Sequence, residues 1–96
     1  MNKSRLIHAP VTSSQIRAGR ALIRWSAEDL AQASAVGLTT IRRAELTEGE
    51  TSMTAANSLA VRRALEAAGV EFIDENGGGA GVRLRKPSDK GPKKSG

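Results

Sequence analysis

The side chains in this chain best suited to recognise another molecule are hydroxyls and guanidiniums gathered in one short segment. Thr39, Thr40, Arg42 and Arg43 all lie between positions 39 and 43. Such groups donate hydrogen bonds to phosphates and to base edges in the DNA major groove. At about 100° per residue, a helix through this segment places Arg42 and Arg43 opposite Ile41. We therefore expect an exposed basic helix face whose chemistry suits nucleic acid.

A short preceding helix is needed to position that basic helix. Ser26 predicts the N-cap of a helix over residues 27–34, and Asp29 occupies the acidic position of a capping box. Trp25 and Leu30 have the spacing of a hydrophobic staple, which fixes the direction in which the chain enters the helix. The pattern predicts a helix pair joined by a tight turn over residues 35–37.

The rest of the chain supplies a support for this pair. We expect four helices, over residues 13–24, 27–34, 38–46 and 55–68. Thr12 and Ser13 are good N-caps for the first helix, Thr54 caps the last, and Gly69 ends it. Helical spacing predicts an apolar face on the last helix, with Leu59 off that face beside Arg62. That apolar face consists of Val61, Ala64, Leu65 and Ala68.

Beyond the helices, alternating residues predict two short strands, over residues 70–73 and 82–85, joined by a glycine-rich loop. We therefore expect a flexible arm over residues 1–11, a helical domain over 12–69, a hairpin over 70–85 and a disordered basic tail over 86–96.

The residues of the helix pair resemble the Cro/cI-type, or XRE-type, helix-turn-helix regulators over roughly residues 16–65. The resemblance rests on Leu30, Ala31, Val36, Thr39, Thr40, Ile41 and Glu45. It implies a mainly α fold, a lambda-repressor-like four-helix DNA-binding domain, here followed by a C-terminal β-hairpin. One departure is Ala35 at a turn position where the family usually has glycine. Another is the small Ala44, where a larger apolar residue is usual.

The same resemblance implies roles for individual residues. Leu38, Thr39 and Arg43 correspond to base-reading positions, and Arg42 neighbours them. The full DNA-binding set is Ala27, Gly37, Leu38, Thr39, Thr40, Arg42 and Arg43. Arg20 and Glu45 correspond to a buried ion pair that recurs in the family. Independently of the resemblance, helical geometry puts Glu45 on the apolar side of its helix.

Composition excludes several function classes. The chain has 96 residues, enough for one small domain, with no cysteine and a single histidine, His8. Neither a thiolate metal site nor a nucleophilic triad can be assembled, so we expect no enzyme activity, no metal and no cofactor. No apolar run reaches the ~18 residues of a membrane span, and the N-terminus lacks a signal-peptide core. The net charge of +5 favours a polyanionic partner, and we expect a cytoplasmic protein.

The expected partner is therefore double-stranded DNA, bound by a transcriptional repressor or activator. We further expect a homodimer that binds an inverted repeat, because an isolated two-stranded hairpin is barely stable in water. The predicted dimerisation residues are Leu59, Val70, Phe72, Val82 and Leu84. The alternatives left open are a hairpin packed on its own helices and a protein-interaction module, such as an antitoxin or anti-activator. Leu46 and Leu59, apolar on polar faces, favour that module.

Overall fold

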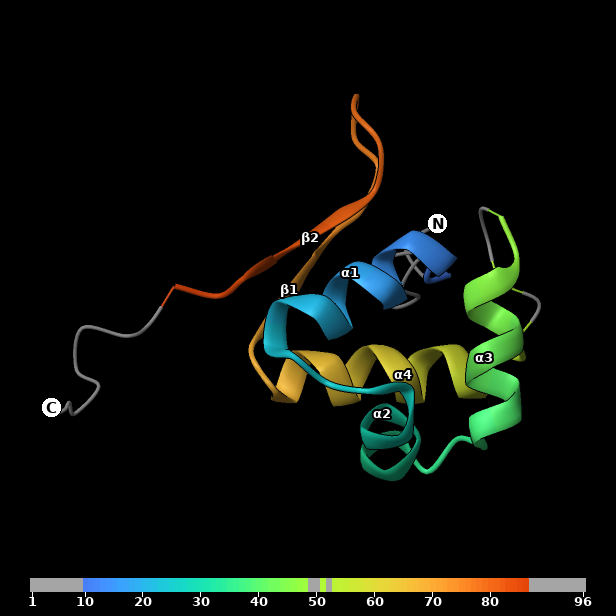
Figure 1. Cartoon of the computed structure of the whole chain (residues 1–96). Coiled ribbons are helices and arrows are strands. Elements are labelled where there is room, and N and C mark those ends of the chain that lie inside the picture. Colours follow the sequence, from blue (N-terminus) through green and yellow to red (C-terminus); the bar gives the residue numbers. More distant parts are fainter. Residues whose placement is uncertain (1–9, 49–50, 52, 87–96) are drawn as a thin grey trace, which may run out of the picture.

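The computed structural model describes residues 10–48, 51 and 53–86, which form a mainly helical domain with a small antiparallel hairpin (Figure 1). The elements are α1 (Ser13–Ile23), α2 (Ala27–Ser34), α3 (Leu38–Leu46), α4 (Ala55–Ala67), β1 (Val70–Ile73) and β2 (Gly81–Leu84). The predicted α2 and α3 are confirmed to the residue. The predicted α1 and α4 each run one residue too far, and the second strand begins one residue earlier than predicted.

Side-chain caps explain where three of the helices begin. Thr12 and Gln15 form a reciprocal capping box at α1, and Ser26 and Asp29 form another at α2. The Thr54 side chain accepts a hydrogen bond from the backbone of α4. These contacts satisfy backbone N–H groups that a helix start leaves without intrahelical partners.

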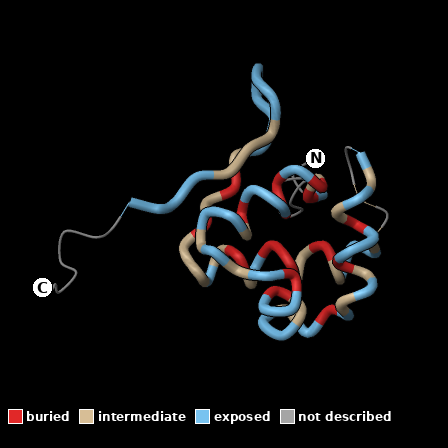
Figure 2. Tube along the Cα trace, viewed as in Figure 1, coloured by how far each residue is buried: buried red, intermediate tan, exposed pale blue. Residues whose placement is uncertain are grey.

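The core lies where α1, α2, α3 and α4 meet and extends under the hairpin (Figure 2). Its members are Val11, Ile16, Ala27, Leu30, Val36, Ile41, Ala44, Val61, Leu65, Val70 and Phe72. Gly19 lets α1 approach α4 and β1 closely. A Cβ at this position would lie 3.3 Å from a methyl of Leu65 and 3.6 Å from one of Val70. The helix-weakening glycine is thus explained by close packing.

The hairpin packs on α1 and α4 of its own chain. Val70 pairs with Leu84 and Phe72 with Val82, so these four side chains share one face of the hairpin. Val70 is fully buried and Phe72 nearly so, whereas Leu84 is 52% exposed. The buried Gln15 amide donates to the backbone carbonyls at the paired ends of the strands, 3.0 Å to Gly81 and 3.4 Å to Ile73.

The predicted boundary between the N-terminal arm and the helical domain is also wrong. Val11 was assigned to the flexible arm, but it is 1% exposed and its N–H donates to the Ser58 hydroxyl at 3.3 Å. Val11, next to the Thr12 cap, therefore belongs to the core beside α4. The local sequence pattern does not reveal this burial, because the contact is with a distant segment. Residues 1–9 of the arm and 87–96 of the tail lie outside the described residues, and Lys86 is exposed.

A second expectation that fails concerns the surface of α4. Arg62 was placed off the apolar face, yet its side chain is only 8% exposed. Its guanidinium carbon lies 4.9 Å from the centre of the Phe72 ring, and its nitrogens pair with Glu66 at 3.1 Å and Asp74 at 3.4 Å. The hairpin therefore covers a charged position of the helix.

Within the described residues, no helix is long and apolar enough to cross a membrane.

Candidate nucleic-acid interface

The turn between α2 and α3 is held in one conformation by local hydrogen bonds. Ala35 has φ 64° and ψ 20°, the left-handed region expected at this position, and its N–H donates to the Ala31 carbonyl at 2.9 Å. The Ser34 hydroxyl donates to the Leu30 carbonyl and accepts from the Val36 N–H, at 2.7 and 3.2 Å. With Val36 buried beneath it, the turn fixes the direction in which α3 leaves.

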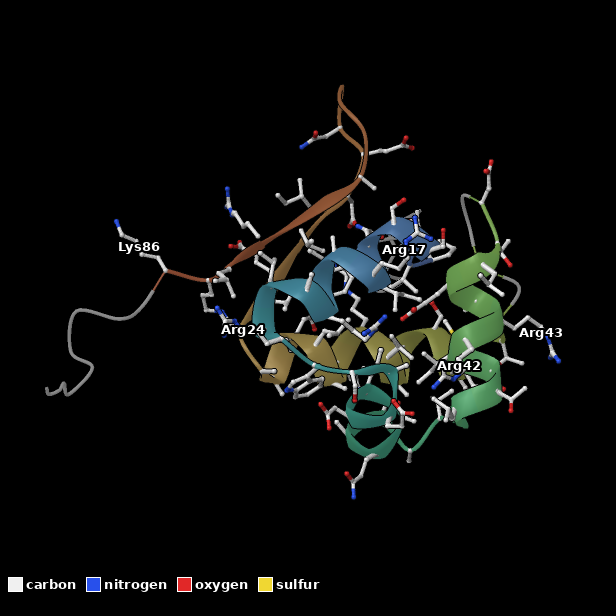
Figure 3. The ribbon with its side chains drawn as sticks, in the orientation of Figure 1. Arg17, Arg24, Arg42, Arg43 and Lys86 are labelled. Carbon is white, nitrogen blue, oxygen red and sulfur yellow. The ribbon has the colours of Figure 1, made fainter. Side chains whose placement is uncertain are left out.

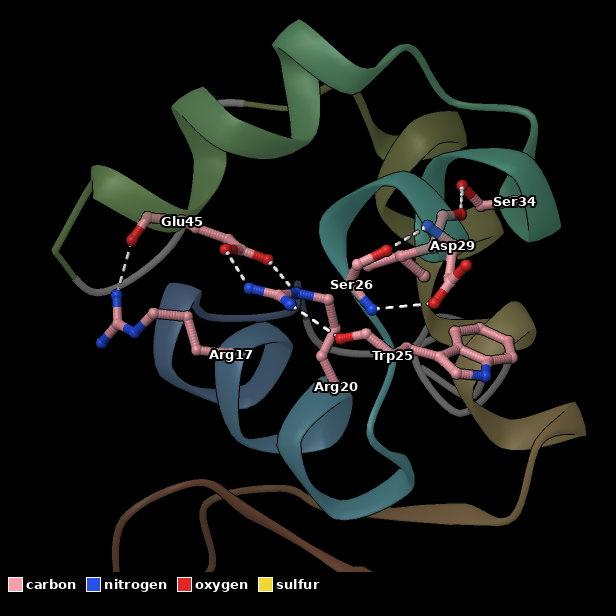
Figure 4. A network of polar contacts seen from close by, with 8 residues as sticks. Arg17, Arg20, Trp25, Ser26, Asp29, Ser34 and Glu45 are labelled. Atoms are coloured by element: carbon pink, nitrogen blue, oxygen red, sulfur yellow. Dashed lines mark hydrogen bonds and ion pairs between the residues drawn. The ribbon is translucent and has the colours of Figure 1, made fainter.

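The predicted Arg20–Glu45 ion pair is confirmed and ties α1 to the last turn of α3 (Figure 4). The guanidinium donates to both carboxylate oxygens, at 2.7 and 2.8 Å, and to the Trp25 carbonyl at 2.8 Å. The side chains of Arg20 and Glu45 are 22% and 11% exposed. The hydrogen bond to Glu45 raises the pKa of Arg20, so this guanidinium stays charged. Such two-point pairing also fixes direction.

A second arginine of α1 supports the same end of α3. The Arg17 guanidinium donates to the backbone carbonyl of Glu45 and to the Ser14 hydroxyl (Figure 4). Carbonyls in the last turn of a helix lack an intrahelical partner, and a cation there also complements the helix dipole. Arg17 therefore helps to hold α3 on α1.

The outer side of α3 carries the residues predicted to meet DNA. Thr39, Arg42 and Arg43 are exposed, and Leu38 and Thr40 are half-buried. Arg43 points away from the body of the domain (Figure 3). The opposite side of α3 packs into the core through two residues, Ile41 and Ala44. The predicted division of this helix into an exposed basic face and a buried apolar face is confirmed.

The remaining predicted residues lie at the starts of the two helices, Ala27 at α2 and Gly37 at α3. Gly37 is exposed and is the N-cap of α3, where it provides no side-chain hydrogen bond. Ala27 begins α2, but its side chain is 8% exposed and belongs to the core. Its side chain therefore offers little surface to DNA, and its backbone N–H at the start of α2 is the group better placed for the predicted role.

One partner of the basic face was not foreseen. Arg42 donates to Glu28 at 2.9 Å, and the two side chains are 57% and 61% exposed. Glu28 lies in the first turn of α2, where an acid also suits the positive end of the helix dipole. The spacing along the chain carries no signal for this contact, because the turn between the helices decides which side chains meet.

Other basic residues lie away from α3. Arg24 is at the far end of α1, and Lys86 follows β2 (Figure 3). Arg83 pairs with Glu71 at 3.0 Å, and Arg85 donates to the Glu66 carbonyl at 2.9 Å. Among the described residues, the positive charge is thus spread over two ends of the domain, and only part of it lies on the basic face of α3.

The predicted dimerisation residues differ in how far the fold buries them. Val70 and Phe72 are buried against their own chain, whereas Leu59 and Val82 are half-buried. Leu84 is the member of the set with a largely exposed side chain. A second copy could reach Leu84 without rearrangement, but it could not reach the buried pair.

In the part of the chain that the structure describes, no three His, Cys, Asp or Glu side chains gather as a metal site. Family models give no match to this chain, and neither do curated proteins. Its function is therefore inferred from the geometry of α2, α3 and their supports.

Proposed function

We propose that this protein binds double-stranded DNA in a sequence-specific manner through α3, as a transcriptional repressor or activator. One observation carries the proposal. A short helix is fixed on its inner side by the core and at its C-terminal end by Arg17 and Arg20, and it presents exposed Thr39 and Arg43 outward. The XRE-type resemblance of the residues supports the same function.

The dimensions and chemistry of α3 suit the major groove. That groove is about 12 Å wide and admits an α-helix with its side chains. Arg43 can donate two parallel hydrogen bonds to a guanine edge, and the Thr39 methyl can contact a thymine methyl. Because the Arg20–Glu45 pair and the α2–α3 turn already fix the position of the helix, binding does not have to order its backbone, and this favours affinity.

The direct test is selection of preferred duplexes from a random pool by the parent protein and by Arg43→Ala. We expect the variant to lose preference at one position in each half-site, at a cost of about 1–3 kcal/mol for the preferred sequence. Arg24→Ala is the matched control, since it removes the same charge from the far side of the domain. An unchanged consensus with Arg43→Ala would remove Arg43 from base recognition, and failure of the parent to select any sequence would reject the proposal.

The homodimer remains part of the proposal. A two-fold dimer would place two copies of α3 on half-sites about one helical turn apart, or a multiple of it. Leu84 and the edges of the hairpin are the surface left for pairing. Truncation after Gly69 would also delete the buried Val70, so Leu84→Lys is the better test. We expect it to halve the mass measured by sedimentation and to make the thermal midpoint independent of protein concentration.

A second candidate function is binding of a protein partner. The observation in its favour is Leu46, which is 84% exposed at the end of α3. A protein partner would cover this leucine, and its affinity would respond to Leu46→Lys and little to salt. DNA binding through phosphates would weaken steeply as salt rises and would be affected far less by Leu46→Lys.

A further inference from the structure

The pairing of Glu28 with Arg42 is the feature of the basic face that a DNA-binding role does not explain. The carboxylate belongs to the first turn of α2, and the guanidinium to the exposed side of α3. They meet at 2.9 Å across the turn, with more than half of each side chain exposed. A negative charge therefore lies on the surface that a DNA phosphate would approach.

We propose that Glu28 competes with DNA phosphates for Arg42 and so limits the sequence-independent affinity of the protein for DNA. This inference rests on the proposed DNA-binding function. An exposed ion pair is weak, so a phosphate can displace the carboxylate. The displaced carboxylate stays beside the phosphate and repels it, so the contribution of Arg42 is partly cancelled in the complex.

The surroundings of the pair support this assignment over a purely structural one. The fold already holds α2 and α3 together through buried Leu30, Val36 and Ile41. The Ser26 and Asp29 capping box satisfies the start of α2 without help from Glu28. By contrast, the partly buried Arg20–Glu45 pair has the geometry of a structural link. Glu28 is thus free to act on an approaching ligand.

Salt dependence separates this role from base recognition. The logarithm of the DNA-binding constant falls linearly with the logarithm of salt concentration, by about 0.9 for each phosphate neutralised. We expect Glu28→Gln to steepen that slope, by at most about 0.9, because Arg42 then neutralises a phosphate without an opposing carboxylate beside it. Affinity for a selected duplex and for a scrambled one should rise by the same factor, about three- to tenfold near 50 mM salt.

The experiment measures binding of both duplexes at several salt concentrations, by fluorescence anisotropy, for four variants. Glu75→Gln, in the exposed loop of the hairpin, makes the same change in net charge and should leave the slope unchanged. Arg42→Gln should weaken binding less in the parent than in the Glu28→Gln background, where it should abolish the gain. Circular dichroism checks that each exposed substitution leaves the fold intact.

Each outcome bears on the proposal. If the salt dependence of Glu28→Gln has the same slope as that of the parent protein, the proposed role of Glu28 is overturned, but DNA binding is not. Loss of affinity for the selected duplex alone, with a changed consensus, would overturn it by showing that Glu28 orients Arg42 toward a base. Absence of binding to every duplex by parent and variants alike would reject the DNA-binding function and this inference together.

Discussion

The α3 end of this domain and its hairpin end both contain arginines, but the arginines are placed differently. At the α3 end, Arg20 donates two hydrogen bonds to the Glu45 carboxylate, whereas Arg43 points away from the body of the domain. At the hairpin end, the guanidinium of Arg62 lies over the Phe72 ring, and Arg83 pairs with a carboxylate on the neighbouring strand. Most of these arginines at either end are paired within the chain, so net charge alone does not locate a partner surface.

The two ends also differ in how they make a sharp turn. The α2–α3 turn places Ala35 at φ 64°, and the turn from α4 into β1 places Gly69 at φ 109°. Only glycine enters such regions without steric cost. The α2–α3 turn thus retains local strain that the turn into β1 avoids, and the buried contacts around α3 must offset it.

The largest expected effect comes from the Arg20–Glu45 link at the α3 end. Arg20→Ala should lower the free energy of unfolding by about 3 kcal/mol, because it leaves Glu45 partly buried without its partner. Replacing both residues by methionine should cost much less, since no charge is then stranded. Urea denaturation gives both values, with Arg43→Ala as the exposed control. A parent-like midpoint for Arg20→Ala would show that the core alone fixes α3.

At the hairpin end, Arg62→Ala should cost about 2 kcal/mol through lost packing and lost cation–π attraction on Phe72. The cost is smaller than for Arg20, because Glu66 and Asp74 are 35% and 48% exposed and remain solvated. Amide hydrogen exchange should quicken most in β1 and β2. The neighbouring exposed Arg63→Ala is the matched control. Equal effects of the two substitutions would mean that the hairpin does not depend on Arg62.

The turns give a pair of opposite predictions. Ala35→Gly should stabilise the protein by about 1 kcal/mol, and Gly69→Ala should destabilise it by at least that amount. Space is not the cause at Gly69, since nothing lies within 4 Å of a Cβ there. Thermal unfolding should show midpoints shifted in opposite directions by several degrees. Destabilisation by Ala35→Gly would show that glycine's unfolded-state entropy outweighs the strain.

The smallest effect concerns the exposed Arg83–Glu71 pair of the hairpin. The hydrogen bond from Arg83 lowers the pKa of Glu71 below its ordinary value. A lowered pKa in the folded state adds stability above the unfolded value of about 4.3, and that stability is lost as pH falls through the folded pKa. Carboxyl chemical shifts should show the pKa of Glu71 returning toward its ordinary value in Arg83→Gln. An unchanged titration would mean that the pair does not persist in solution.

Local pattern was sufficient for most of the backbone at the α3 end. The Ser26–Asp29 capping box, the bounds of α2 and α3, and the division of α3 into two faces all follow from residues close in sequence. Helix caps and helical periodicity are local effects, so a single sequence reveals them. The Arg20–Glu45 pair was also predicted, from the resemblance and from the inward position of Glu45.

Contacts between distant segments were decided only by the tertiary structure. The burial of Arg62 requires the hairpin to fold back over α4, and the burial of Val11 requires α4 to lie beneath the start of α1. The Glu28–Arg42 pair depends on the angle set by the α2–α3 turn. Sequence determined the elements and their faces because those depend on near neighbours. Which charge is buried, paired or left outward depends on packing between elements, and spacing along the chain does not encode it.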